Sequence, residues 1–183
     1  MTTKKVAVHQ PTILTIGHST NTLDAFIEML RVHSVKHLVD VRSIPRSRHN
    51  PQFNRDTLPE ALRLKEIAYT HIAQLGGLRH TRQDSPNTGW HNSSFRGFAD
   101  YMQTPEFEAG LAQLILLASR EQTAIMCAEA VPWRCHRSLI ADALTIRGLP
   151  VGDIMSSSRT QPHVLTPFAK VSGIHITYPP EAV

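Results

Sequence analysis

The sequence predicts an α/β fold, with a mostly parallel sheet of about five strands and helices on both faces. Short apolar runs of strand length alternate along the chain with segments whose apolar residues recur at helical spacing. This alternation favours parallel strands joined by crossover helices. The chain has 183 residues, of which 41% are hydrophobic. Because this is enough to bury an ordinary core, we expect a single domain over residues 1–183.

Strand positions follow from short apolar runs that are bounded by turn-forming residues. The expected strands of the sheet are residues 12–17, 37–41, 68–72, 123–127 and 150–155. A polar leader that ends at Pro11 precedes the first of them. A further strand-like run, residues 174–178, lies in a polar, Pro-rich C-terminal tail over residues 156–183.

Helix positions follow from apolar residues spaced three and four apart. The expected helices are residues 22–30, 56–66, 95–102, 105–119 and 135–147. Asp56 has the side chain and the position of a helix N-cap, and Ser19 or Thr20 can cap the first helix. Pro132 suits the first position of the last helix.

A long polar loop is expected over residues 78–94, between the third strand and the third helix. Loops of this length are uncommon in compact domains and are often functional. We therefore expect this loop to form a lid or an outer wall of a site.

The charge of the chain is unevenly distributed. The formal net charge is +4, yet residues 42–82 hold eight Lys or Arg and three acidic residues, hence a net charge of +5. Such a segment fits an anionic small molecule or a nucleic acid as partner, and it also fits a solvated basic face.

The sequence indicates a cytoplasmic protein. No apolar run approaches the ~18 residues that a membrane span needs. Two lysines near the N-terminus are not followed by an apolar stretch, which is not typical of a secretory signal. The only cysteines are Cys127 and Cys135, and we expect reduced thiols rather than a disulfide framework.

Polar side chains or glycines lie at or just after the ends of four of the expected strands. They are His18 and Ser19, Asp40 and Arg42, the glycines of residues 75–77, and Cys127 with Glu129. In open parallel sheets, ligands bind beyond the carboxyl ends of the strands. We therefore expect these groups to converge on one site.

Three residues at the turn after the fourth strand are candidate catalytic groups: Glu129, His136 and Cys127. Glu129 can act as a general acid or base or bind a ribose hydroxyl, and the alternative is an ion pair that fixes the loop. His136 can transfer a proton or bond a backbone carbonyl. Cys127 faces an expected helix N-terminus, which lowers a thiol pKa.

Cysteine chemistry at this turn is the weaker interpretation. Phosphatase-like and rhodanese-like loops offer bare backbone N–H groups to an anion, whereas here Glu129 follows Cys127 by two residues. The first arginine, Arg134, comes seven residues after Cys127. A buried, inert thiol is thus a better interpretation of Cys127 than a group for sulfur or phosphoryl transfer.

The candidate ligand-binding residues share a place beside the same strand ends. They are His18, Ser19, Asp40, Arg42, Arg46, Arg134 and Arg137. Arginine can hold phosphate through two parallel hydrogen bonds, or it can pair with Glu129 or Asp40. The spacing of Cys127, Cys135 and His136 fits no familiar zinc pattern, so we predict neither a metal nor another cofactor.

Several stretches resemble one known family. They are TIGHST at 15–20, LVDVRSIPRS at 38–47, LGG at 75–77, MCAEAVPWRCHRSLIADAL at 126–144, and LTPFAK and ITYPP within 165–180. With these stretches the chain resembles the domain of unknown function 488 family. The resemblance implies a soluble bacterial or archaeal α/β protein, and it implies no particular activity, substrate or cofactor.

The leading functional hypothesis is an α/β protein that binds a phosphate-bearing or nucleotide-like anion at the strand ends. A further hypothesis is that the protein is an enzyme that transforms this anion. The alternative is a nucleic-acid-binding or nucleic-acid-processing module. It would use the basic segment with Phe53, Tyr69, Trp90 and Phe95 as stacking groups. A third hypothesis is a scaffold whose buried ion pairs only resemble a site.

Overall fold

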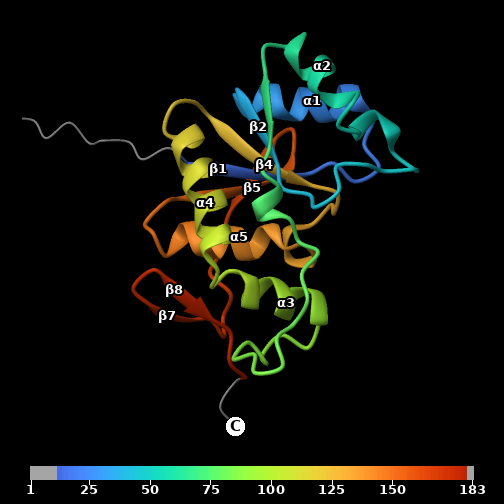
Figure 1. Cartoon of the computed structure of the whole chain (residues 1–183). Coiled ribbons are helices and arrows are strands. Elements are labelled where there is room, and N and C mark those ends of the chain that lie inside the picture. The colour runs from blue at the N-terminus through green and yellow to red at the C-terminus, as the bar shows by residue number, and fades with distance from the viewer. Residues whose placement is uncertain (1–11, 181–183) are drawn as a thin grey trace, which may run out of the picture.

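A six-stranded sheet forms the centre of the computed structural model, which describes residues 12–180 (Figure 1). Its strands are β1 (Ile13–Gly17), β2 (His37–Asp40), β3 (Ala68–His71), β4 (Thr123–Cys127), β5 (Val151–Ser156) and β6 (Arg159–Pro162). Their order is β3-β2-β4-β1-β5-β6, and only β6 runs antiparallel to its neighbour. The predicted mostly parallel sheet is confirmed, with its first five strands at the expected positions.

Helices cover both faces of the sheet, as predicted (Figure 1). They are α1 (Leu23–Val32), α2 (Leu58–Arg63), α3 (Ser93–Tyr101), α4 (Pro105–Ala118) and α5 (Arg137–Thr145). Helices α1 and α2 lie on one face and α4 and α5 on the other, while α3 lies farther from the sheet beside α5.

Alternation along the strands creates two cores. In β4, Ile125 and Cys127 belong to the core under α4 and α5, whereas Ala124 and Met126 belong to the core under α1 and α2. This follows from the two-residue period of a strand, which turns successive side chains to opposite faces. The last residue of β4 therefore directs its thiol toward α5.

Two expected helix caps are wrong. Thr57, not Asp56, precedes α2, and it makes no capping bond with its side chain. Thr22 caps α1 by accepting a hydrogen bond from the Ala25 N–H, so neither Ser19 nor Thr20 does so. Ser19 instead adopts a left-handed conformation with φ of 47°.

The last helix begins later than predicted. Pro132 starts a separate 3₁₀ turn, Pro132–Arg134, and α5 begins only at Arg137. Cys135 lies between them with extended backbone angles, because the chain must reverse before α5 can pack on the sheet. The N-terminus of α5 thus points at the end of β4.

The C-terminal tail contains more strand than expected. The run at 174–178 forms β8 (His175–Thr177), which pairs with β7 (Lys170–Ser172) in a hairpin apart from the main sheet. Strands β6 and β7 were not predicted, because their residues are all exposed and show no apolar pattern. The leader before residue 12 and the last three residues of the tail lie outside the described residues.

The 78–94 loop is held in place rather than free. Asp100 of α3 accepts hydrogen bonds from the Arg82 N–H at 2.8 Å, the Ser85 hydroxyl at 2.5 Å and the Asn87 amide at 2.7 Å. Asn87 in turn accepts the Tyr178 N–H at 2.9 Å, which joins the loop to the tail. The loop is thus anchored to α3 and to the tail.

Candidate functional site

A cavity of about 390 Å³ lies at the carboxyl ends of β1, β2 and β4. Seven of the ten site residues expected from the sequence line it. They are His18, Arg42, Arg46, Cys127, Glu129, Arg134 and His136. The other three, Ser19, Asp40 and Arg137, lie beside or beneath it. Ser43, Ile44, Leu78 and Phe95, which the sequence did not single out, form part of its wall.

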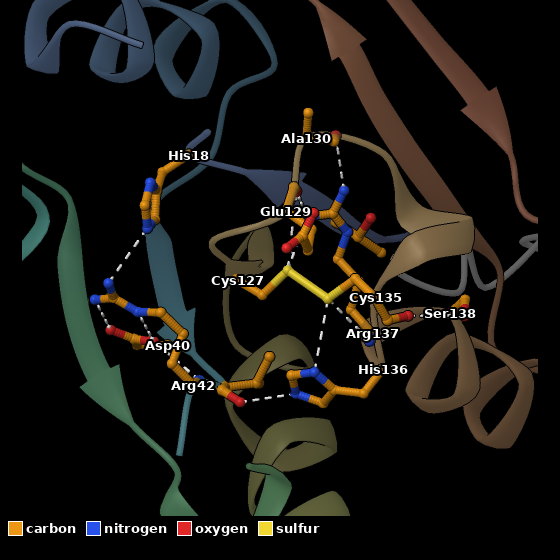
Figure 2. The surroundings of a disulfide bond; sticks show 12 residues. His18, Asp40, Arg42, Cys127, Glu129, Ala130, Cys135, His136, Arg137 and Ser138 are labelled. Carbon is orange, nitrogen blue, oxygen red and sulfur yellow. Dashed lines mark hydrogen bonds and ion pairs between the residues drawn. A yellow bond between two sulfur atoms is a disulfide. The ribbon is translucent and has the colours of Figure 1, made fainter. Parts of the chain in front are cut away.

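The Asp40–Arg42 pair forms one side of the cavity floor. Arg42 donates to both carboxylate oxygens of Asp40, from Nε at 2.9 Å and from Nη2 at 2.6 Å (Figure 2). Asp40 also accepts the Tyr69 hydroxyl at 2.8 Å, and Arg42 donates to the carbonyl of Phe53 at 2.7 Å. Asp40 is therefore a buried counter-ion that orients Arg42, and it has no free surface for a ligand.

His18 lies between Arg42 and the turn after β1. Its Nδ1 donates to the carbonyl of Ser19 at 2.9 Å, so Nε2 is left to accept the Arg42 Nη1 donor at 3.3 Å. Burial, with the charge of Arg42, lowers the pKa of His18, which keeps the ring neutral. The ring also stacks on Phe53 with centroids 4.3 Å apart.

The rim of the cavity carries three charged side chains that are all exposed: Arg46, Arg134 and Glu129. None of the three forms a side-chain ion pair within residues 12–180. The alternative in which Glu129 forms an ion pair with Arg42, Arg134 or Arg137 is therefore not found among the described residues. An unpaired rim of this kind can bind a charged ligand without first breaking an internal bond.

His136 stands at the other side of the floor, held as a neutral ring. Its Nε2 donates to the carbonyl of Val41 at 2.9 Å, which leaves the Nδ1 lone pair free for another donor. Burial lowers the pKa of His136 to about 4. The ring packs so closely on Gly77 that a Cβ there would lie 2.5 Å from Nδ1.

Cys127 and Cys135 are joined by a disulfide bond (Figure 2), so the expectation of two reduced thiols is wrong. Both line the cavity, and both are nearly buried. They meet because Cys127 ends β4 and Cys135 stands two residues before α5. A spacing of eight residues gave no sign of this contact, since the intervening loop has no regular pattern.

Arg137 fixes that intervening loop from inside the protein. Only 1% of its surface is exposed. Its Nη1 donates to the carbonyl of Glu129 at 2.8 Å, and its Nη2 donates to the carbonyl of Ala130 at 3.0 Å. The same Nη1 lies 3.2 Å from the Cys127 sulfur. Arg137 thus has no open face for a ligand, contrary to its expected binding role.

The loop after β4 has the wrong polarity for a phosphatase-like cradle. Its carbonyls at Glu129 and Ala130 turn toward Arg137. A close approach from β1 reinforces this arrangement, because a Cβ on Gly17 would collide with the Glu129 carbonyl oxygen. Phosphoryl transfer needs N–H groups at this place. The loop is instead built to hold a guanidinium.

Ser19 is separated from the cavity. Its main-chain N–H donates to the carbonyl of Ala128 at 2.9 Å, and the residue lines a neighbouring hollow with Asn21 and Ser157. Its part in the structure is to extend the pairing of β1 with β4 beyond the last strand residue.

The stacking groups proposed for a nucleic acid are largely occupied. Phe53 is fully buried, so its expected role as a stacking surface is wrong. Trp90 stacks on Phe95 with centroids 4.7 Å apart, and the Tyr69 hydroxyl is bonded to Asp40. Of the four aromatic residues, Phe95 alone lines the cavity.

Together, the parallel sheet and the polar cavity at its carboxyl edge define an α/β protein whose cavity lies where ligands usually bind in this architecture. The family model described as "Domain of unknown function DUF488" matches residues 22–144, about two-thirds of the chain. The chain therefore belongs to this family. No curated protein and no solved structure was found to match it. Within residues 12–180, every helix is too short or too polar to cross a bilayer.

Proposed function

We propose that this protein binds a phosphate-bearing small anion in the cavity at the carboxyl ends of β1, β2 and β4. The observation that carries the proposal is the pair of exposed rim arginines, Arg46 and Arg134, which have no acidic partner among the described residues. A guanidinium binds a phosphate group through two parallel hydrogen bonds. These two residues would therefore provide the direct contacts.

The charges of the residues that line the cavity support the same ligand class. Three arginines line the cavity, Arg42, Arg46 and Arg134, and Glu129 is its single acidic lining residue. Asp40 offsets the charge of Arg42, while Arg46 and Arg134 are not offset. With Glu129 counted as well, the charges of these groups still sum to a positive value, which favours anions.

The apolar wall of the cavity indicates that the ligand also has an apolar part. Ile44, Leu78 and Phe95 form an apolar side next to the arginines. A site with a few convergent polar groups on an apolar wall is typical of small-molecule binding. A nucleotide-like ligand, with a planar base and a phosphate, would match both parts.

Glu129 is the residue we assign to turnover, if the bound molecule is transformed. Its carboxylate is exposed at the rim and has no ion-pair partner in the described chain. It can accept a hydroxyl hydrogen bond or a proton from a ligand that the two arginines hold. His136 is less suited to general base catalysis, because burial lowers its pKa to about 4.

A thermal-shift screen tests binding. Inorganic phosphate, pyrophosphate, nucleoside phosphates and sugar phosphates are compared on the wild type and on Arg46→Ala and Arg134→Ala. At least one class should raise the melting temperature of the wild type, and each substitution should reduce that shift. Arg120→Ala is the matched control, because Arg120 is exposed just before β4, at the opposite edge of the sheet. No shift with any compound, or equal shifts in all four proteins, would reject the proposal.

The other two hypotheses receive less support. The basic segment remains the argument for a nucleic acid, but Arg63 and Arg82 within it are bonded to Glu60 and Asp84. Single-stranded DNA or RNA that bound with a steep salt dependence would favour this alternative. A scaffold without a ligand would not need an open cavity beside Glu129. A cytoplasmic location stays a prediction from the sequence.

A further inference from the structure

The wall of the cavity contains two cysteine sulfurs that are joined to each other. Cys127 comes from the end of β4, and Cys135 comes from the residue before His136. Both line the cavity, with exposed fractions of 2% and 4%. Both residues therefore border the space that a small molecule in the cavity would occupy.

The surroundings of Cys127 favour its ionised form. Arg137 is buried, and its hydrogen-bond partners in the described chain are two main-chain carbonyls and the Cys127 sulfur. Of these partners, only Cys127 can carry a negative charge, while the carboxylates of Asp153 and Glu129 act on Arg137 electrostatically without a hydrogen bond to it. Because a buried cation is stabilised by a nearby anion, Arg137 and a Cys127 thiolate would form an ion pair once the disulfide is reduced.

Cys135 has different surroundings. Its sulfur lies 3.6 Å from Nδ1 of His136 and 3.5 Å from the main-chain N–H of Arg137. Since Nε2 of His136 donates to Val41, Nδ1 holds a lone pair that can accept a hydrogen bond from a Cys135 thiol. The guanidinium contacts Cys127 and not Cys135, so the two sulfurs are unequal.

We propose that Cys127 and Cys135 form a redox-active pair that exchanges with a small anionic disulfide in the cavity, Cys127 attacking and Cys135 resolving. The pair itself is independent of the ligand proposed above, and only the anionic class of the substrate depends on it. Arg137 is a positioning residue for the Cys127 thiolate.

The exchange balances in two steps. The Cys127 thiolate attacks one sulfur of the substrate disulfide, and a bond forms between them. The substrate S–S bond breaks, and its leaving sulfur takes the electron pair and one solvent proton. Cys135 then attacks Cys127, the mixed disulfide breaks, and the departing substrate sulfur takes the proton that Cys135 loses beside His136. The protein gains one disulfide, and the substrate becomes two thiols.

Single-cysteine variants test the roles of the two sulfurs. Cys135→Ser and Cys127→Ser are reduced and then incubated with oxidised glutathione, and adducts are followed by mass spectrometry. Cys135→Ser should accumulate a stable adduct on Cys127, and at neutral pH it should react faster than Cys127→Ser. The expected ratio is about threefold for each pKa unit that separates the thiols, because a more abundant thiolate is also less nucleophilic. Equal rates, or a faster Cys135, would overturn the assignment.

The pH dependence of alkylation tests the part of Arg137. In Cys135→Ser, the midpoint for Cys127 should lie below the ~8.5 of a free thiol. Adding Arg137→Met should move it upward. If that double variant does not fold, Cys127→Ser serves as the comparison, and its Cys135 should show the higher midpoint. Thiols that are inert in the native protein yet react after unfolding would overturn the proposal.

A neutral substrate separates this proposal from anion binding. The wild type and Arg46→Ala are first reduced and freed of reductant, and their rates of exchange with oxidised glutathione and with bis(2-hydroxyethyl) disulfide are then compared. Slower exchange with the anionic compound alone would support both proposals. Unchanged rates with both compounds would reject anion recognition and leave the redox pair standing. Absence of exchange with both, beside an intact phosphate-induced thermal shift, would reject the redox pair alone.

Discussion

Helix α5 has a buried polar cluster on each side, and the two clusters differ in how far their polar groups are satisfied. On the side of the tail, Asp142 accepts hydrogen bonds from His163 at 2.7 Å, from Tyr178 at 2.8 Å, and from both the N–H and the hydroxyl of Thr166. We call these four residues the tail clamp. Every carboxylate oxygen in it has a partner.

On the side of the cavity, the buried polar groups are not all hydrogen-bonded. Arg137 is as deeply buried as Asp142, yet its Nε has no hydrogen-bond partner and none of its partners is a carboxylate in the described chain. Glu129 and Arg134 stand unpaired at the rim above it. The contrast indicates that the tail clamp serves stability, whereas the exposed charges at the rim of the cavity contribute little to it and match the anion binding proposed above.

The largest expected effect is the loss of the tail clamp. Asp142→Ala leaves a buried His163 without its main counter-ion and removes bonds to Thr166 and Tyr178. Breaking a buried pair in this way costs about 3–5 kcal/mol. Denaturant unfolding measures the free energy. A loss below about 1 kcal/mol would contradict a structural role for the clamp.

The matched control is an exposed ion pair. Glu60 and Arg63 are bonded at 2.7 Å on the surface of α2. Glu60→Ala should leave the unfolding midpoint unchanged, because solvent and salt weaken such pairs.

Stability should be highest near pH 6.5 and fall on both sides, because the two clusters shift histidine pKa values in opposite directions. Burial alone would lower the pKa of His163, but Asp142 and Asp153 raise it to about 9. Between 6.5 and 9, folded His163 holds a proton that the unfolded chain has lost, so raising the pH destabilises. Burial lowers the pKa of His136 to about 4. Between pH 6.5 and pH 4, His136 takes up a proton in the unfolded chain but not in the folded protein, so lowering the pH destabilises the folded protein.

Two substitutions separate these contributions. Each window should show a slope of up to about 1.4 kcal/mol per pH unit in the free energy of unfolding. His163→Gln should flatten the alkaline side, and His136→Gln should reduce the slope on the acid side, to which the lowered pKa of His18 also contributes. Identical pH profiles for the wild type and both variants would show that neither histidine carries the effect.

A smaller effect is expected at the contact between the cavity floor and the glycine turn. Gly77→Ala would place a methyl group 2.5 Å from the His136 ring, which Val41 and Phe98 hold in place. Overpacking of this kind costs about 1–3 kcal/mol. Leu78→Ala is the control, since Leu78 is exposed and should change stability by less than about 0.5 kcal/mol. Equal stability of the two variants would contradict a tightly fixed ring.

The smallest effect on stability is expected at the rim. Arg46→Ala and Arg134→Ala remove exposed side chains without internal ion pairs, and each should alter stability by less than about 0.5 kcal/mol. The same substitutions should weaken anion binding. A large loss of stability together with unchanged anion binding would show that the rim arginines serve stability rather than binding.

The sequence predicts the main sheet well because four of its five parallel strands are largely buried, whereas β3 is exposed to half-buried and gives a weaker signal. The run at 123–127, for example, is a strand with the expected bounds and all five residues buried. Strand β6 shows the limit, because its four residues are exposed and paired on one side only. Such edge strands depend on the neighbouring strand and carry no apolar signal of their own.

The place of the site was predictable, and its internal contacts were not. His18, Arg42 and Glu129 follow strand ends, and parallel topology brings strand ends together. The disulfide and the burial of Arg137 depend on the path of the loop after β4, which no periodicity describes. The sequence therefore suggested an Arg137–Glu129 ion pair, whereas Arg137 binds the main-chain carbonyl of Glu129.

The central claim is that Arg46 and Arg134 are free to bind an anion. An NMR titration with inorganic pyrophosphate, observing the Nε–Hε signals of the arginine side chains, tests it most directly. Arg63 and Arg82, which are already bonded to carboxylates, serve as internal references. Arg46 and Arg134 should show saturable shifts, and the two references should change little. Signals that all move together with ionic strength, or no shift at Arg46 and Arg134, would contradict anion binding by these two arginines.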